Sequence, residues 1–370
     1  MDFRFIDDEY VWNIPLSSPA VRGAQFLQSW EWGVFQQTFG RAVHRIQIVE
    51  EETVMAIMQV FEYPLPFGKR YLYAPRGPVI LSDDHDALST IVHLIHRACR
   101  EVGYNVGAMF VRLEPMYYHP YILENVRMIN IEEEETRSSL LEELRALGFR
   151  SGFSVQPMDE LAVVLDKDED DLLAAMHEKT RYNIRLAIKH GVRARLIEQP
   201  DYAKRVFPFF WSLLQETAKR QKIRTHSRQY YERMVDLLVP RGVLKLMLAE
   251  YDNKIIAAHL LSVFGDTVYY LHGGSSYDNR QLMAPYLLHW EEIKLAKRME
   301  KKFYNFGGIV PAGETNHSWQ NLTKFKEGFV RDGETGQRLH YIGAFDLVFQ
   351  PMWYRIYKAA RHLQSFIRIR

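Results

Sequence analysis

The stretch "VLKLMLAEYDNKIIAAHLLSVFGDTVYYLHGG" (243–274) contains three apolar runs that are separated by two short polar breaks. The runs are rich in the β-branched, aromatic and other apolar residues that are typical of strands. The breaks, "DN" and "GD", are turn sequences. We therefore predict three consecutive antiparallel strands, followed by a helix (284–299) and a further strand (302–309).

The first half of the chain repeats this order of elements without repeating the residues. Strands are predicted at 42–50, 53–63 and 70–80, a helix at 86–103, and a further strand at 107–115. A unit of antiparallel strands followed by a helix and a strand is typical of acetyltransferase-like (GNAT) folds. The sequence therefore predicts an α/β (α+β) protein with two tandem acetyltransferase-like domains.

The same pattern places the domain boundaries. Residues 155–332 are predicted to form the second acetyltransferase-like domain, and residues 1–154 the first. The C-terminal tail, 333–370, is too short to form a domain by itself. We expect it to pack on the first domain and count it as part of that domain.

Composition limits the class of protein. The 370 residues are 47% hydrophobic and 25% charged, with a net charge of +1, as in a folded chain that is long enough for two cores. Cys99 is the only cysteine, which excludes an internal disulfide and a multi-cysteine metal site. The start, "MDFRFIDDEY", has no signal-peptide pattern, and no run approaches the roughly 20 apolar residues of a membrane-spanning helix. We expect a cytoplasmic protein.

Cofactors are not expected. Acyltransferases that use coenzyme A carry a Q/R-x-x-G-x-G/A loop, whose backbone amides hold the pyrophosphate at a helix N-terminus. The only formal match, "QTFGRA" (37–42), follows a predicted helix and enters a predicted strand, which is the wrong context. The 14 histidines include no H-E-x-x-H or similar spacing, so no metal site is expected. We therefore expect an acyl donor that is carried by something other than coenzyme A.

A second stretch, "EKTRYNIRLAIKHGV" (178–192), predicts an amphipathic helix with a cationic face. Arg181, Arg185 and Lys189 are spaced by four residues, so they lie along one side of the helix. Two interpretations remain open. The face is either a solvated basic surface or an anion site for a phosphate-rich substrate or a nucleic acid.

Several segments of the chain occur in the order and at the spacing of one known family: "FLQSWEWGVFQ" (26–36), "YAPRGPV" (73–79), "EKTRYNIRLAIKHGV" (178–192), "ETAKRQKIRTHSRQYYERM" (216–234), "YYLHGGSSYDNRQLMAPYLLHWEEIKLAKRM" (269–299), "YNFGGI" (304–309) and "NLTKFKEGF" (321–329). They resemble the Fem family (FemA/FemB/FemX), the aminoacyltransferases that build peptidoglycan interpeptide bridges. The likeness covers nearly the whole chain. Residues 193–207 leave no room for the helical arm of FemA-type members, so the chain is most similar to the armless FemX type.

The resemblance implies a function. An aminoacyl group would pass from aminoacyl-tRNA, a co-substrate, to the side-chain amine of the third residue of a stem peptide. The acceptor would be a peptidoglycan precursor, either UDP-linked or lipid-linked, and the reaction would contribute to cell wall biosynthesis. No other cofactor and no metal are implied. The amino acid that is transferred is not implied either.

The resemblance also implies the residues of the site. Lys326 would meet the ester end of the tRNA and stabilise the developing oxyanion, with Phe325 beside it. Glu114 would face the acceptor amine as a proton acceptor or as a positioning group, and Tyr270 would lie in the acceptor site. From the residues alone, the alternatives are a surface lysine, a core phenylalanine, a turn carboxylate and a half-buried strand tyrosine.

The sequence departs from the family at the residues that bind the diphosphate of the precursor. Gln36 and Gln37 stand about where the family has a lysine in the first domain, and Arg41 is nearby. The second cationic position falls on His226, which Arg224 precedes by two residues. Arg41, Arg224 and His226 are therefore the candidates for the diphosphate site.

The tail has a marked charge pattern. After Asp346 there is no acid, but there are five basic residues interleaved with aromatic ones: Arg355, Lys358, Arg361, Arg368 and Arg370. The tail is either a helix packed on the first domain with its charges in water, or a peripheral contact with an anionic membrane surface. In the second case the protein would lie at the inner face of the membrane.

Two other functions remain open. The chain could be a coenzyme-A-dependent N-acyltransferase that acts on a small amine or on a protein. It could also be a non-catalytic module that binds tRNA or the precursor. The first lacks a well-placed phosphate loop, and the presence of both Lys326 and Glu114 argues against the second.

Overall fold

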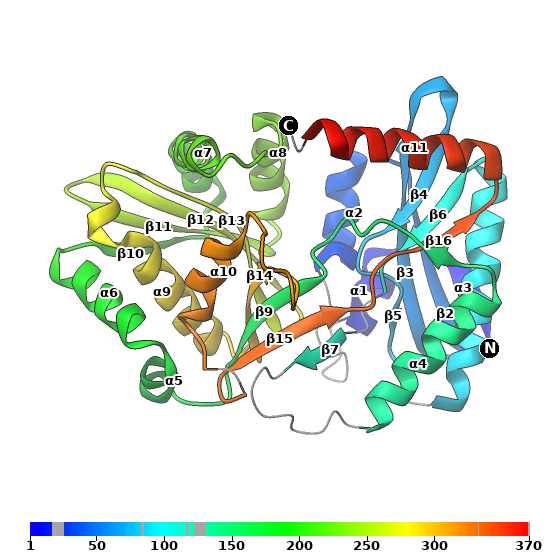
Figure 1. Ribbon diagram of the computed structural model, residues 1–370, viewed down its shortest axis with the longest axis horizontal. Coiled ribbons are helices and arrows are strands. Elements are labelled where there is room, and N and C mark those ends of the chain that lie inside the picture. The colour runs from blue at the N-terminus through cyan, green and yellow to red at the C-terminus, as the bar shows by residue number, and fades with distance from the viewer. Residues whose placement is uncertain (17–25, 83–84, 116–117, 122–130, 332, 369–370) are drawn as a thin grey trace.

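The computed structural model describes residues 1–370 apart from 17–25, 83–84, 116–117, 122–130, 332 and 369–370, and it describes side chains for these except 85, 118–121, 131–137 and 363–368. Two sheets lie side by side, and helices cover both of them (Figure 1). The first sheet is built mainly from the first half of the chain, and the second sheet mainly from the second half.

The first sheet has the strand order β1 (Asp2–Phe5), β2 (Val43–Glu50), β3 (Thr53–Pro64), β4 (Arg70–Ala74), β6 (Phe110–Leu113), β16 (Phe345–Val348), β8 (Arg150–Ser151). The short strand β5 (Val79–Ile80) pairs with β3. Strands β4 and β6 are parallel, because helix α3 (His85–Asn105) carries the chain back between them. The other strand pairs of this sheet, among the described residues, are antiparallel.

The second sheet has the strand order β10 (Arg193–Ile197), β11 (Leu244–Tyr251), β12 (Lys254–Phe264), β13 (Thr267–Ser275), β14 (Phe303–Gly308), β9 (Asp159–Val164), β15 (Gly336–Tyr341), β7 (Tyr118–Tyr121). Helix α9 (Ala284–Arg298) joins β13 to β14, and these two strands are parallel. The unit β11–β12–β13–α9–β14 therefore has the same order and the same pairing directions as β2–β3–β4–α3–β6. The repeated order that the sequence predicts is confirmed.

The remaining helices cover the sheets and fill the region between them: α1 (Glu9–Leu16), α2 (Trp30–Gln37), α4 (Ile131–Ala146), α5 (Glu169–Ala175), α6 (Glu178–Lys189), α7 (Pro200–Gln221), α8 (Arg228–Leu238), α10 (Gln320–Glu327), α11 (Pro351–Arg368), and the single 3-10 turns η1 (Phe26–Gln28), η2 (Pro66–Gly68) and η3 (Arg280–Leu282). The Ser29 hydroxyl caps α2 by accepting a hydrogen bond from the backbone N–H of Trp32. Helix α2 therefore begins directly after Ser29, close to the boundary between the two halves of the chain, which we call the seam.

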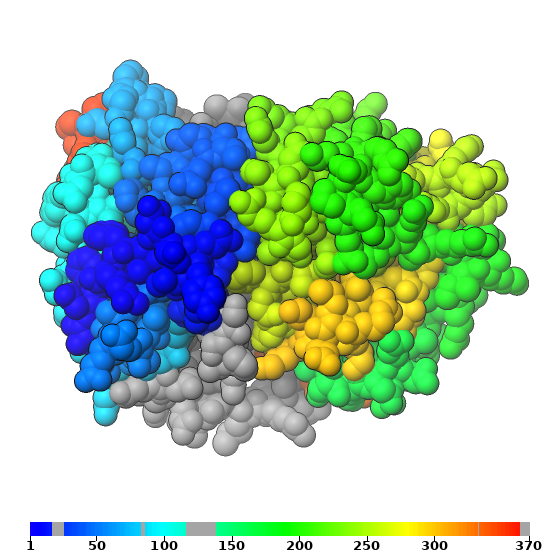
Figure 2. Space-filling view, turned by 180° about the vertical axis from the view of Figure 1, so that it is seen from behind, coloured from blue at the N-terminus to red at the C-terminus, as the bar shows by residue number. Residues whose placement is uncertain are grey.

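A shared apolar cluster joins the two halves. Phe26 and Phe35, from η1 and α2, pack with the buried faces of α7, α8 and β12. The rings of Phe35 and Tyr230 lie 4.9 Å apart across this seam. Seen from behind, residues of the first half, in blue, meet residues of the second half, in green, over the upper part of this face (Figure 2). The orientation of the halves is therefore set by packing as well as by the polar contacts described below.

Sheet membership differs from the predicted domain boundaries. Strand β15 (Gly336–Tyr341) belongs to the tail that we assigned to the first domain, but it pairs with β9 in the second sheet. Strand β7 (Tyr118–Tyr121) also joins the second sheet, through β15. Strand β15 satisfies the edge hydrogen bonds of β9, and β7 satisfies those of β15, which the sequence order does not reveal. Of the tail, β16 and α11 pack on the first half.

No helix in the described part of the chain combines the length and the apolar character needed to cross a membrane. Helix α11 lies across one end of the first half, with its inner face on the aromatic residues Tyr71 and Phe110 (Figure 1). The basic residues Arg355, Lys358 and Arg361 lie on this helix. Of the other two basic residues of the tail, Arg370 and the side chain of Arg368 lie outside the described residues.

A buried ion pair anchors the tail to the first sheet. Arg112 on β6 donates from Nε and Nη2 to the two oxygens of Asp346 on β16, both at 2.7 Å, and both side chains are fully buried. We expect Asp346→Ala to lower the free energy of unfolding by about 3–5 kcal/mol, because it leaves the Arg112 charge buried and uncompensated. Chemical denaturation measures this loss.

The matched control is Glu232→Ala, which removes the exposed partner of Arg228 on α8. An exposed pair of this kind contributes about 0–1 kcal/mol, so this variant should unfold close to the wild type. Equal, small losses in both variants would show that Asp346 does not anchor the tail.

Candidate active site

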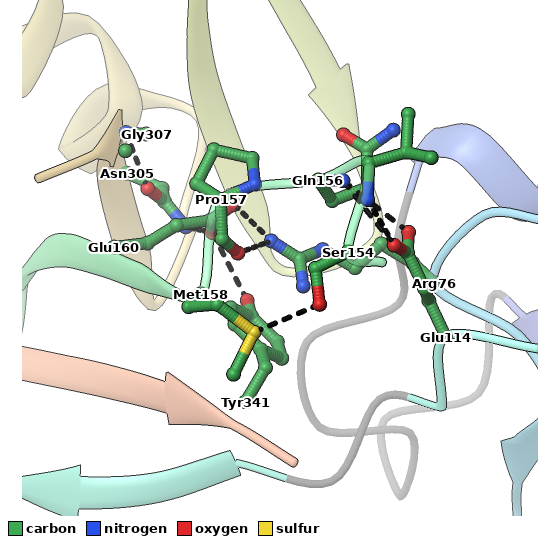
Figure 3. A network of polar contacts seen from close by, with 12 residues as sticks. Arg76, Glu114, Ser154, Gln156, Pro157, Met158, Glu160, Asn305, Gly307 and Tyr341 are labelled. Carbon is green, nitrogen blue, oxygen red and sulfur yellow. Dashed lines mark hydrogen bonds and ion pairs between the residues drawn. The ribbon is translucent and has the colours of Figure 1, made fainter. Parts of the chain in front are cut away.

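A short segment, residues 154–160, crosses from the first sheet to the second, and Glu114 at the end of β6 holds it (Figure 3). The Glu114 carboxylate accepts hydrogen bonds from the backbone N–H of Val155 at 2.5 Å and from that of Gln156 at 3.4 Å. It also accepts one from the Tyr73 hydroxyl at 2.5 Å. Both oxygens of this buried carboxylate are therefore engaged, and Glu114 fixes the crossing segment to the first half.

Arg76 and Glu160 connect the halves a few residues farther along the crossing segment. Arg76 Nη2, from the loop after β4, donates to Glu160 Oε1 at 2.6 Å and to the Pro157 carbonyl at 2.9 Å. The other Glu160 oxygen accepts from Asn305 Nδ2 at 2.9 Å and from the Tyr341 hydroxyl at 3.0 Å. The guanidinium also lies over the Tyr341 ring (Figure 3). This buried network joins β9, β14 and β15 to the first half.

Lys326 lies on the second-half side of this junction. It is 3% exposed on α10, so the surface-lysine alternative is wrong, and its Nζ donates to the Gly308 carbonyl at 2.6 Å. Burial lowers the pKa of Lys326 to about 8, although Glu160 opposes the shift. A Cβ on Gly308 would lie 2.8 Å from Pro157, so the carbonyl that binds Lys326 belongs to a residue packed on the crossing segment. Lys326 therefore bonds a residue that packs on Pro157, and Glu114 bonds the backbone of the two residues just before Pro157.

Phe325 and Tyr270 lie in an aromatic cluster behind Lys326. The Phe325 ring contacts Tyr286 at 4.9 Å and His289 at 5.5 Å between centroids. The half-buried Tyr270 ring lies 4.8 Å from the rings of both His259 and His289. Burial, together with the charge of Glu292, raises the pKa of Tyr270, so its hydroxyl stays protonated.

Gly273 makes room for the Tyr270 hydroxyl. A Cβ at position 273 would lie 2.4 Å from Tyr270 Oη and 2.5 Å from His259 Cδ2. No side chain larger than hydrogen fits there unless these groups move. The glycine therefore helps to place Tyr270, and the family resemblance alone did not single it out.

Behind Tyr270 lies a buried polar network that the sequence analysis missed. Glu292 accepts from the Tyr304 hydroxyl at 2.5 Å and pairs with His259 Nδ1 at 2.7 Å, and His289 Nδ1 lies 3.2 Å from its second oxygen. His289 Nδ1 also bonds the Tyr304 hydroxyl at 2.7 Å. Burial raises the pKa of Glu292, but the two histidines outweigh burial and hold it well below its usual range.

This network is the one group of metal-ligand type among the described residues, with ligand atoms within 4.8 Å of one another. A metal ion with bonds of about 2.0 Å would hold its ligand atoms roughly 3.3 Å apart around a tetrahedral centre. Between the candidate ligands, His259 Nδ1 lies 2.7 Å from Glu292 Oε1, which is a hydrogen-bond length, and His289 Nδ1 lies 3.2 Å from Glu292 Oε2. His289 and Glu292 also both bond the Tyr304 hydroxyl, at 2.7 and 2.5 Å, so the contacts described are those of a hydrogen-bonded network.

Two of the three diphosphate candidates lie close together across the seam. The Arg41 guanidinium lies 4.3 Å from the centroid of the Tyr63 ring and donates to Gln36. His226 stacks on the Tyr230 ring at 3.9 Å. Partial burial and the charge of Arg41 lower the pKa of His226. Arg224 is exposed on the loop between α7 and α8.

The basic helix forms as predicted, at Glu178–Lys189, but its three cations do not share one role. Arg181 Nη1 donates to the carbonyls of Ala174 and Met176 at the end of α5, so it caps that helix. Arg185 and Lys189 are exposed. Only these two are free to bind an anion without loss of an internal hydrogen bond.

The structure adds residues that the sequence analysis did not single out. Arg76 lies inside "YAPRGPV", which carried the resemblance, but nothing local to that motif indicates a partner at position 160. His289 and Glu292 are spaced by one helical turn, a pattern that could have been noticed. Their partner His259 comes from a different element, β12, and has no local signal.

Two buried histidines predict a pH dependence of stability. Burial lowers the pKa of His289 to about 4 and that of His272, which the nearby His226 lowers further, to about 3. The unfolded chain takes up these protons below about pH 6.5, whereas the folded protein does not. Stability should therefore fall as the pH drops from about 6.5 towards 4. Urea denaturation at several pH values measures this loss.

In the same experiment, the His289→Gln variant should lose less stability than the wild type between about pH 6.5 and 4. The His93→Gln variant, changed at an exposed position on α3, should lose as much as the wild type. An equal loss of stability at acid pH in all three proteins would contradict the assignment of this loss to buried histidines.

Comparison with known proteins gives the family. The model of a family described as "FemAB family" matches residues 19–254 and 239–362. A UDP-N-acetylmuramoylpentapeptide-lysine N(6)-alanyltransferase of Weissella viridescens is 23% identical over 82% of this chain and 84% of its own length. A lipid II:glycine glycyltransferase of Staphylococcus epidermidis is 21% identical over 91% of each chain.

Solved structures give the same fold. A crystal structure of FemX has a TM-score of 0.78 with 19% identity, over 96% of this chain and 99% of its own. A tandem GNAT protein from the clavulanic acid biosynthesis pathway has a TM-score of 0.51 with 13% identity, over 94% and 98%. These matches confirm the predicted α/β fold with two acetyltransferase-like units. Because the family model matches most of its length, the chain belongs to the FemAB family.

Proposed function

We propose that this protein transfers an aminoacyl group from aminoacyl-tRNA to the stem-peptide amine of a peptidoglycan precursor, and that it does so in the cytoplasm. The observation that carries the proposal is the buried Lys326, whose ammonium is tied to the junction that Glu114 holds from the other half. The names of the alanyl- and glycyltransferase relatives support an aminoacyl donor and a precursor acceptor.

The reaction joins an amine to an ester. The neutral amine attacks the carbonyl carbon of the aminoacyl ester, an oxyanion forms, and its collapse breaks the bond to the tRNA 3′ oxygen, which takes the proton that the amine releases. An ammonium has three N–H donors, and Lys326 uses one on Gly308, so the others can bind the oxyanion. One such donor contributes about 3–4 kcal/mol to the transition state.

Glu114 positions the acceptor in this proposal. Both of its oxygens already accept hydrogen bonds, so it cannot take a proton without loss of a contact to the crossing segment or to Tyr73. Its negative charge can still attract and orient the incoming ammonium. Tyr270 and Phe325 supply the wall against which the acceptor lies.

The remaining candidates serve the two anionic substrates. We assign Arg41, as a cation, and His226, as a hydrogen-bond donor, to the diphosphate of the precursor; Arg41 lies over the Tyr63 ring and His226 stacks on the Tyr230 ring. Arg185 and Lys189, exposed on α6, are assigned to tRNA phosphates. Coenzyme A is not a substrate in this proposal. The segment "QTFGRA" (37–42) lies between the C-terminal end of α2 and the start of β2, so it has no helix N-terminus to bind the pyrophosphate.

The direct test combines tRNAs charged with radiolabelled amino acids with the nucleotide-linked and the lipid-linked precursor. Label that appears in either precursor supports the proposal and identifies the amino acid. Label in neither precursor, together with stabilisation of the protein by acetyl-coenzyme A, would favour the coenzyme-A-dependent alternative.

Lys326→Ala should lower kcat by roughly 100-fold or more, because it removes the charge opposite the oxyanion. Lys326→Arg should restore little of this loss, since a planar guanidinium does not replace a compact ammonium. For the wild type, kcat should fall as the pH rises through about 8, where Lys326 loses its proton. Steady-state kinetics at saturating acceptor measure all three effects.

Lys324→Ala, two residues away on the same helix, is the matched control and should keep near-normal activity. Normal kcat in the Lys326→Ala variant would remove this residue from the mechanism.

The double variant Arg185→Ala/Lys189→Ala should weaken binding of aminoacyl-tRNA and reduce the dependence of its affinity on salt, because each lost phosphate contact releases about one counterion fewer. Affinity for the precursor should not change. Binding titrations at several salt concentrations measure both quantities. The control is Arg97→Ala/Arg100→Ala, which removes two exposed arginines from α3. Equal salt slopes in both double variants would leave α6 as a solvated basic face.

A further inference from the structure

An apolar ring stands in solvent at the tip of the loop between β3 and β4. Phe67, in η2, is 86% exposed. Its φ of 63° lies in the left-handed region, which costs a residue with a bulky side chain about 1–2 kcal/mol. Both the backbone strain and the exposure of the ring are unfavourable in the isolated protein. Such a combination is typical of a surface that contacts something else.

Helix α11 has two different apolar faces. Its inner face, with Trp353, Tyr354 and Tyr357, packs on the first half. Its outer face contains Met352, 66% exposed, and Ile356, 50% exposed, and the exposed Ala359 follows one turn later. The outer face therefore has no partner among the described residues, although its apolar side chains are spaced as on a buried helix.

The loop tip and the helix form one surface. The rings of Phe67 and Trp353 lie 6.2 Å apart, and Lys69 Nζ lies 4.7 Å from the Trp353 ring. Lys69 also donates to Gln350 Oε1 at 3.1 Å, just before α11 begins. Figure 1 shows the β3–β4 loop beside α11 at the same end of the first half. We call this the hairpin–helix surface: Phe67, Lys69, Met352, Arg355 and Ile356.

The charges of this surface have one sign. Lys69 and Arg355 belong to it, and Lys358 and Arg361 flank it on α11. No acid occurs after Asp346, and the one acid between residues 61 and 70 is Glu62, which is bonded by Arg70 and His44. A second copy of this chain would bring these like charges together across a two-fold axis. An anionic lipid surface complements them and also accepts the apolar side chains.

We propose that the hairpin–helix surface docks on an anionic membrane, with Phe67, Met352 and Ile356 inserted at the level of the headgroups. A row of rings leads from this surface to the diphosphate candidates: Tyr357 lies 5.8 Å from Tyr71, Tyr71 lies 5.2 Å from Tyr63, and Arg41 lies over Tyr63. Three successive contacts thus link Arg41 to the inner face of α11, whose outer face belongs to the docking surface. This part rests on the proposed function and assigns the acceptor to the lipid-linked class, whose diphosphate lies in the headgroup layer.

The binding test needs no enzyme activity. The full-length protein should float with phosphatidylcholine vesicles that contain phosphatidylglycerol and not with vesicles of phosphatidylcholine alone, and added salt should release it. The double variant Phe67→Ser/Ile356→Ser should lower the partition coefficient about tenfold or more. Ile14→Ser, at a position that is also 50% exposed, is the control and should bind like the wild type. Absence of wild-type binding, or equal loss in the control, would overturn the proposal.

Sedimentation and activity separate the alternatives. A wild-type dimer that the double variant converts to a monomer would assign the surface to a second copy and overturn membrane docking. If docking holds, the double variant should keep wild-type turnover on the soluble nucleotide-linked acceptor and lose at least several-fold on the acceptor embedded in vesicles. Vesicle binding without transfer to either acceptor would refute the proposed function and leave the docking surface standing.

Discussion

The ion pair between Arg76 and Glu160 is the contact on which the candidate site depends. Lys326 comes from the second half and Glu114 from the first, so neither residue can act with the other unless the halves keep one orientation. The pair is buried, and it also binds the Pro157 carbonyl, Asn305 and Tyr341. Removal of one partner would leave an uncompensated charge in the interior. The orientation of the halves is therefore specified by electrostatics, and the apolar cluster around Phe35 adds packing free energy to it.

Local signals were enough to predict the repeated unit of the fold. The turns "DN" and "GD" separate apolar runs whose ends agree with β11, β12 and β13 to within about one residue, and the helix predicted at 86–103 is α3, His85–Asn105. Such elements are encoded by side-chain periodicity within a few turns or strands. The resemblance of "NLTKFKEGF" to a family motif drew attention to Lys326, but only the structure shows that this lysine is buried.

Contacts between distant segments could not be predicted in this way. The sequence of β15 has the pattern of any short strand, and no residue near position 336 indicates that β9 is its partner. The Arg112–Asp346 pair spans 234 positions. The polar network behind Tyr270 combines one helical turn, His289 to Glu292, with a histidine from β12. Each of these contacts depends on the tertiary arrangement, and a single sequence carries no periodic signal for it.

Strand β16 has a consequence for synthesis of the chain on the ribosome. It lies between β6 and β8 in the first sheet, yet its residues 345–348 are made long after β6, since Asp346 follows Arg112 by 234 positions. Until Asp346 leaves the exit tunnel, Arg112 has no counterion and one side of β6 has no hydrogen-bonding neighbour. The N-terminal domain of a nascent chain usually completes its fold first, but the first half of this protein cannot do so before the second half is made. The first sheet stays incomplete until residues 345–348 have emerged.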